Sequence, residues 1–167
     1  FAGGSPSGNY FLDEFGIDDA LISRLLSKAL SRGGDFADLY FEFSVTNYLG
    51  LEDGKVNQSN GDISLGVGIR TVKGDQIGYG YTQDLSEESI MSAAATAASL
   101  CDMTAVLAAT SFNRPQTGSY YPVPEGFDGI PAQLKLPVLQ QINEKCFSLS
   151  PEIVKVNAGF QSSIKRI

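Results

Sequence analysis

The chain has 167 residues, a net charge of −7 from 19 acidic and 12 basic side chains, and no histidine. The lack of histidine excludes histidine-based acid-base catalysis, a Ser-His-Asp triad and histidine metal ligation. The acidic balance without a basic run argues against direct nucleic-acid binding, and no apolar run reaches the roughly 20 residues of a membrane span.

We expect a cytoplasmic protein. The first residue is Phe1 rather than Met, so we also expect a piece of a longer gene product, whose export stays an alternative. Cys101 and Cys146 lack C-x-x-C spacing and fall in expected helices, which predicts reduced core residues rather than a disulfide.

The first elements expected are a flexible segment and a helix. Residues 1–16 are predicted to be a flexible N-terminal segment, since the first ten are rich in Gly, Ser and Pro. A domain is expected over 17–167. Asp18 is placed to cap a helix that ends at Gly33-Gly34. Its apolar stripe consists of Leu21, Ile22, Leu25, Leu26, Ala29 and Leu30.

A β-meander is predicted next. Residues 37–52 alternate apolar and polar side chains, which is typical of one long strand or of two strands joined by a bulge. The Asp53-Gly54 pair predicts a tight hairpin of the primed type. Residues 55–60 continue as a strand, and the polar stretch at 57–62 predicts a bend.

Two glycine-rich strands follow the bend, at 63–72 and 77–82. Each carries a G-x-G, formed by Gly66 and Gly68 in the first and by Gly78 and Gly80 in the second. Glycine within a strand weakens it, so close approach of another backbone is the expected reason. Two alternatives are open for what covers this glycine surface. It is either a helix of the same domain, or an extended peptide or partner subunit that Arg70 also contacts. The G-x-G is not a nucleotide motif, since no helix follows it directly.

The hairpin between these strands has two alternatives for its register. If the loop at 73–76 has an odd length or a bulge, Ile69 and Tyr79 share a face; an even loop places them on opposite faces. We expect the odd or bulged loop, with all the apolar residues on one side.

An Ala-rich helix is expected from Ser86 to about Asp102, with a capping hydroxyl and acidic residues in its first turn. Small residues on a helix and on a sheet permit close packing. We therefore predict that the side carrying Ala94 and Ala97 covers all four glycines. On this basis, replacing Gly68 by Val should overpack the contact.

The last third is expected to hold a connector, a helix and a strand. Residues 103–133 have no period, and Tyr120-Tyr121 in this connector are either a recognition patch or loop anchors. A helix is expected at about 136–149 with Pro137 in its first turn. Residues 152–167 alternate as a strand whose partner is expected in sequence beyond this chain.

The carboxylates of the meander are the remaining candidates for chemistry. Glu42, Glu52, Asp53 and Asp62 could pair as acid and base, but roles in turns and on solvated strands explain them better. No serine lies in a G-x-S-x-G elbow. We therefore predict no catalytic residue and no metal ligand in this chain.

Several motifs together resemble the N-terminal domain of the TldD/PmbA family of metallopeptidases, also called modulators of DNA gyrase. The resemblance spans about residues 17–102 and 134–167 and is stronger to the TldD branch. The motifs are D-L-Y-F-E-F-S (38–44), L-x-L-E-D-G-K-V (49–56), G-V-G-I-R-x-V-x-G (66–74), G-Y-G-Y-T-x-D-L-S (78–86) and S-P-E-I-V-K-V (150–156).

The resemblance implies a zinc peptidase that acts on unfolded or small peptides. Its H-E-x-x-x-H zinc motif belongs to a C-terminal domain that nothing here matches, so no cofactor is expected in this chain. An α+β fold is expected, with an antiparallel β-meander of about four to five strands and about three helices. The implied role is to enclose substrate in a homo- or heterodimer. The alternative is a non-catalytic binding or scaffolding module that pairs through its sheet.

Overall fold

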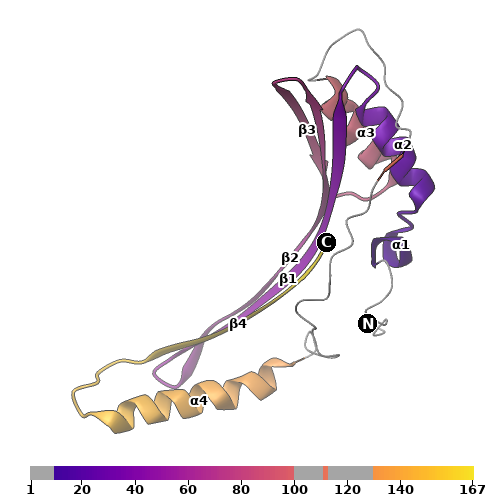
Figure 1. Cartoon of the computed structure of the whole chain (residues 1–167). Helices are drawn as coiled ribbons and strands as arrows, with labels where there is room; N and C mark the ends of the chain where they lie inside the picture. The colour runs from indigo at the N-terminus through magenta and orange to yellow at the C-terminus, as the bar shows by residue number, and fades with distance from the viewer. Residues whose placement is uncertain (1–9, 100–110, 113–129) are drawn as a thin grey trace. The chain divides into compact units, whose positions relative to one another are not determined.

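The computed structural model describes residues 10–99, 111–112 and 130–167 of the chain. These residues form an α+β fold with one open four-stranded sheet in the order β3-β2-β1-β4 (Figure 1), which confirms the predicted fold class. Within these ranges, no helix has the length and apolar character needed to cross a membrane. The elements are α1 (Tyr10–Phe15), α2 (Asp19–Ala29), β1 (Phe36–Glu52), β2 (Lys55–Lys73), β3 (Gln76–Thr82), α3 (Glu87–Ser99), α4 (Ala132–Leu149) and β4 (Asn157–Arg166).

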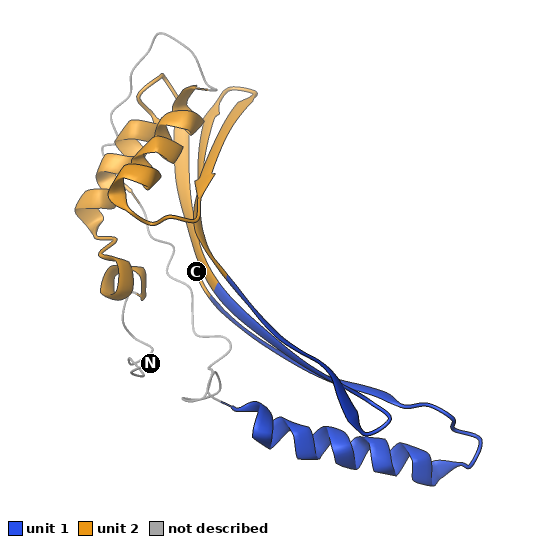
Figure 2. Ribbon diagram, turned by 180° about the vertical axis from the view of Figure 1, so that it is seen from behind, with its two compact units in different colours: residues 1–3, 44–63, 120–165 blue, residues 4–43, 64–119, 166–167 orange. Residues whose placement is uncertain are grey.

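The chain divides into two compact units, coloured separately in Figure 2. Among the described residues, the helical unit contains 10–43, 64–99, 111–112 and 166–167. The hairpin unit contains 44–63 and 130–165. The strands β1 and β2 contribute to both units. No observation tests the domain boundaries predicted from the sequence, and they stay predictions.

The core of the helical unit lies between the sheet and helices α1 to α3, which cover one of its faces (Figure 1). The α2 stripe is buried as predicted, through Leu21, Leu25, Leu26 and Ala29. It packs with Val67 and Ile69 of β2 and with the alanine side of α3. Burial of these side chains is the main term that holds the helices on the sheet.

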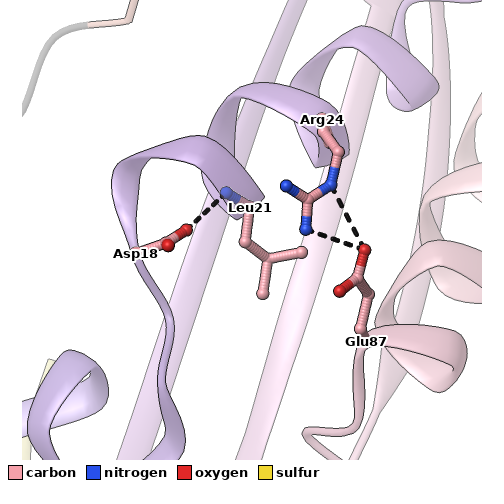
Figure 3. Close-up of polar contacts among 4 residues, drawn as sticks. All are labelled: Asp18, Leu21, Arg24 and Glu87. Carbon is pink, nitrogen blue, oxygen red and sulfur yellow. Dashed lines mark hydrogen bonds and ion pairs between the residues drawn. The ribbon is translucent and has the colours of Figure 1, made fainter.

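Local polar contacts fix where α2 begins and how it meets α3 (Figure 3). Asp18 caps α2 as predicted, since its Oδ1 accepts a hydrogen bond of 2.7 Å from the Leu21 amide. Arg24 of α2 donates to Glu87 of α3 from Nη2 at 2.8 Å and from Nε at 3.2 Å. Both side chains of this pair are about half exposed, so it orients the helices more than it stabilises them.

Helix α1 was not predicted, because its residues lie in the stretch expected to be flexible. Its aromatic residues explain why it is ordered: Phe11 is 6% exposed and its ring lies 5.4 Å from that of Phe41. Tyr10 packs at 5.3 Å from Phe43, and the Arg166 guanidinium lies 4.7 Å from the Tyr10 ring. The Gly-, Ser- and Pro-rich composition of the first residues concealed this aromatic anchor.

In the hairpin unit, the tight turn between β1 and β2 is confirmed. Asp53 and Gly54 have φ angles of 47° and 79°, as a primed two-residue turn requires. Asp53 also accepts a hydrogen bond of 2.8 Å from the Val156 amide through Oδ1, while its own amide donates to the Val156 carbonyl at 3.0 Å. These two bonds hold the turn against the segment that precedes β4.

The structure corrects three predicted features of β2, α4 and β4. No bend divides β2, which runs unbroken from Lys55 to Lys73 although residues 55–63 are exposed. Helix α4 begins at Ala132, so Pro137 lies inside the helix rather than in its first turn. The partner expected beyond the chain for β4 is within it, since β4 lies beside β1.

Two predictions on cysteine and on the connector can be placed only in part. Cys146 lies in α4, half-buried and not in a disulfide. Cys101 and the pair Tyr120-Tyr121 lie outside the described residues.

Candidate interaction surface

The register of the β2–β3 hairpin decides which side chains face outward in the helical unit. Arg70 is opposite Tyr79, Ile69 is opposite Gly80, and Lys73 is opposite Gln76. The loop therefore holds two residues and no bulge interrupts the ladder, so the prediction of an odd or bulged loop is wrong. Gly74 takes the first loop position with a φ of 53°, the position at which a type II′ hairpin requires glycine.

This register places Ile69 and Tyr79 on opposite faces. Residues directly opposite in a ladder share a face. Val67, Ile69 and Thr71 therefore share the core face with Gly78 and Gly80, and all five are buried. The other face carries Gly68, Arg70, Tyr79 and Tyr81. The apolar residues of the hairpin are therefore divided between two faces, and the prediction that they all lie on one side is wrong.

The four strand glycines are consequently split between the two faces. A Cβ at Gly80 would clash with the backbone carbonyl of Ala93, so α3 does pack directly on this glycine. At Gly68 the nearest atoms belong to the Tyr79 ring, with Cζ at 3.0 Å from a built Cβ. At Gly66 the nearest atom is the Thr82 carbonyl oxygen at 2.9 Å. Coverage by the Ala-rich helix is thus confirmed for Gly80 and wrong for Gly66 and Gly68.

We call the outward face of β1, β2 and β3 in this unit the tyrosine face. Tyr79 and Tyr81 are 54% and 75% exposed, with rings stacked at 6.5 Å, and Ile77 on the same face is 63% exposed. Tyr79 lies over Gly68, an arrangement in which an aromatic ring protects the bare backbone of a strand glycine. The tyrosine face comprises Asp38, Tyr40, Glu42, Gly68, Arg70, Ile77, Tyr79 and Tyr81.

Charged pairs fix the polar part of the tyrosine face. The Arg70 guanidinium donates to both carboxylate oxygens of Asp38, at 2.9 Å and 2.8 Å. This bidentate hydrogen bonding raises the pKa of Arg70 above its usual value. On β1, the Tyr40 hydroxyl donates to Glu42 at 2.8 Å. The Arg70 guanidinium, named as a contact in the alternative of a peptide or partner surface, is therefore oriented by Asp38, with about half of its side chain exposed.

Two further carboxylates considered for acid-base chemistry, Glu52 and Asp53, form structural contacts in the hairpin unit. Glu52 forms an ion pair of 2.5 Å with Lys155, and this hydrogen bond lowers the pKa of Glu52 and raises that of Lys155. The Asp53 carboxylate accepts the hydrogen bond from the Val156 amide next to the turn. Among residues 10–99, 111–112 and 130–167, no three Cys, Asp or Glu side chains gather closely enough to hold a metal ion.

The open antiparallel sheet and the helices on one of its faces define the class of protein as an α+β domain, and its other face carries exposed tyrosines. Comparison with known proteins shows which family the chain resembles. Residues 37–101 match the profile of the PmbA/TldA metallopeptidase domain 1, which confirms the resemblance to the N-terminal domain of the TldD/PmbA family.

A curated relative carries a name of the same family, and solved structures share the fold. The metalloprotease TldD homolog of Haemophilus influenzae is 23% identical over 138 residues, which are 81% of this chain and 29% of that protein. A crystal structure of a candidate modulator of DNA gyrase from Bacteroides thetaiotaomicron has a TM-score of 0.64 at 14% identity, covering 87% of this chain and 34% of that one. TldE from Thermococcus kodakarensis has a TM-score of 0.50 at 15% identity, covering 86% and 34%. The chain therefore spans about a third of the length of these relatives.

Proposed function

We propose that this chain is the substrate-enclosing and dimerisation domain of a TldD-like zinc metallopeptidase, and that it carries no catalytic residue itself. The match of residues 37–101 to the first domain of that family supports the domain assignment. The absence of histidine supports the second part, because the H-E-x-x-x-H motif needs two histidines. Zinc would then be held by a different domain of the whole protein.

The exposed tyrosines are the observation that supports an enclosing role. Exposed aromatic side chains that cluster on one face mark an interaction site, because a monomeric domain usually buries such area. Strand β3 is also an outer strand of the sheet, and an extended peptide can add to such a strand through backbone hydrogen bonds. Alternate side chains of that peptide would pack on Tyr79 and Tyr81. An unfolded peptide supplies both the free backbone and the apolar side chains.

Peptide binding to the intact chain tests this role. We expect an unfolded, fluorescently labelled peptide to bind, and a Tyr79→Ser/Tyr81→Ser double variant to bind at least tenfold more weakly. Leu149→Ser is the matched control, because Leu149 is 71% exposed but belongs to the hairpin unit. Equal loss in the control would indicate non-specific apolar binding. Unchanged binding in the double variant would refute the role of the tyrosine face.

The competing function is a non-catalytic module that pairs with a partner chain through its sheet. The outer position of β3 favours this function equally, since a partner strand can occupy the same edge. The sequence of the complete gene separates the two. An H-E-x-x-x-H motif in the same reading frame supports the peptidase, whereas a complete gene without it leaves only the binding module.

A further inference from the structure

A cavity of about 370 Å³ lies in the hairpin unit, at the start of α4. The described residues that line it include one cationic side chain, Lys135, and no carboxylate. The chain as a whole has a net charge of −7, whereas the lining of this cavity is positive because of Lys135. Its lining includes Leu49, Asn60, Ile130, Ala132, Lys135 and Phe160.

Lys135 is the unusual member of this lining. It is 9% exposed, although lysine is rarely buried without a charged partner. Its Nζ lies 3.3 Å from the Ser162 hydroxyl oxygen and 5.1 Å from the centre of the Phe160 ring. Among the described residues, no carboxylate forms an ion pair with it. An ammonium group has three donors, so the Ser162 hydroxyl leaves two of them for a ligand.

The start of α4 adds positive potential on the same side. Pro131 occupies the N-cap position and forms no side-chain capping bond. The Leu134 amide donates to the Pro131 carbonyl at 3.0 Å, whereas the amides before it have no acceptor within the helix and form the positive end of its dipole. Ala132 and Lys135 both lie in the first turns of this helix and both line the cavity. An anionic group in the cavity would thus meet the ammonium and the helix terminus together.

The remaining walls select against a fully hydrated anion. Leu49, Ile130 and Phe160 contribute apolar surface, while Asn47 and Asn60 contribute amides. A phosphate ion would leave the apolar walls in contact with charge, which is unfavourable. A ligand with one carboxylate and an apolar body satisfies both parts. The volume falls within the range of small-molecule sites.

We propose that this cavity binds an apolar carboxylate, of the kind present at the C-terminus of a peptide that ends in Leu or Phe. The carboxylate contacts Lys135 Nζ and the apolar side chain packs towards Leu49 and Phe160. This site belongs to the hairpin unit, shares no residue with the tyrosine face, and does not depend on the proposed peptidase role.

Calorimetric titration of the intact chain tests the proposal with matched peptides. An N-acetylated tetrapeptide ending in Leu with a free carboxylate should bind at least tenfold more tightly than the same peptide with a C-terminal amide. Lys135→Met keeps the aliphatic stem and removes the charge, so it should reduce binding of the acid to the level of the amide. Lys145→Met, an exposed position on the same helix, should leave binding unchanged.

A second variant covers the case in which Lys135→Met does not fold. Ala132 is exposed at the first position of α4, so Ala132→Trp should fold and fill the cavity, abolishing binding of the acid. Octanoate serves as a free carboxylate: binding equal to that of the peptide acid would support a general carboxylate site, and weaker binding a peptide site. Equal affinity for acid and amide, no binding of either, or full displacement by equimolar inorganic phosphate would overturn the proposal.

Discussion

Adding one methyl group at Gly80 should destabilise the chain, whereas the same methyl at Gly68 should not. Both glycines lie in neighbouring strands of one hairpin, and neither has a positive φ. A Cβ at Gly80 would overlap the backbone carbonyl of Ala93, which cannot move unless α3 shifts on the sheet. A Cβ at Gly68 would meet only the far end of the Tyr79 ring, and that side chain is 54% exposed and can rotate away.

The two magnitudes follow from opposing terms. Overpacking a close contact costs about 1 to 3 kcal/mol, while replacing Gly by Ala restricts the unfolded chain and returns about 0.4 to 1 kcal/mol. We therefore expect Gly80→Ala to lower the free energy of unfolding by about 1 to 2 kcal/mol. For Gly68→Ala the entropic gain offsets the lost contact of Tyr79, so the change should stay within about 0.5 kcal/mol.

Urea unfolding followed by far-ultraviolet circular dichroism measures both variants. With a slope of about 2 kcal/mol per molar urea, Gly80→Ala should lower the midpoint by about 0.5 to 1 M and Gly68→Ala by less than about 0.3 M. Coincident transitions monitored by tyrosine absorbance would justify two-state analysis. Equal destabilisation in both variants, or a larger loss at Gly68, would refute the face assignment and restore the sequence-based hypothesis that α3 covers Gly68.

Three further predictions concern capping, pH and metal. Asp18→Ala should lower the free energy of unfolding by about 1 kcal/mol in the same urea series, because the Leu21 amide loses its acceptor; no change would show that water replaces the cap. The Ser89 hydroxyl and the Ser86 amide lower the pKa of Asp84 from its usual value, so its contribution to stability is present above about pH 4 and is lost as pH falls through the lower folded value. Asp84→Asn should therefore flatten the acid limb of the stability curve, and an unaltered limb would contradict this. The purified chain should hold no stoichiometric zinc at micromolar concentration, because it has no histidine and because no three Cys, Asp or Glu side chains gather among residues 10–99, 111–112 and 130–167; metal analysis after dialysis checks it.

Much of the fold could be predicted because the local signals agree with the tertiary contacts. The Asp18 cap, the α2 stripe and the Asp53-Gly54 turn each act over a few residues, and each is confirmed. The long β1 strand is also confirmed, since its alternation places Leu39, Phe41 and Phe43 on the core. Sequence patterns report such features well, because the physical cause lies within one turn or strand.

The errors occur where a distant contact decides the structure. The polar stretch at 57–62 forms a strand because pairing with the neighbouring strand satisfies its backbone, whatever its side chains prefer. Helix α1 is ordered because Phe11 reaches Phe41, which no local pattern encodes. The site residue that sequence analysis missed is Lys135. Its only sequence signal is a lysine four residues before the buried Leu139 on the same helix face, and such a lysine is usually exposed.

The register of one hairpin connects these findings to function. A slip of a single residue between β2 and β3 would turn Tyr79 and Tyr81 into the core, and the tyrosine face would not exist. Hydrogen bonds to Asp35 hold the β2–β3 loop in the observed register. Asp35 accepts from the Gly74 amide at 3.1 Å and from Lys73 Nζ at 2.8 Å. Asp35 also donates its own amide to the Val72 carbonyl at 2.8 Å. Gly80 opposes the same slip, because a tyrosine would take its place under α3 in the slipped register. Any side chain larger than glycine there would meet the backbone of Ala93. Gly80, one of the glycines expected to lie under a helix or a partner, therefore helps to fix the position of the aromatic residues that face solvent.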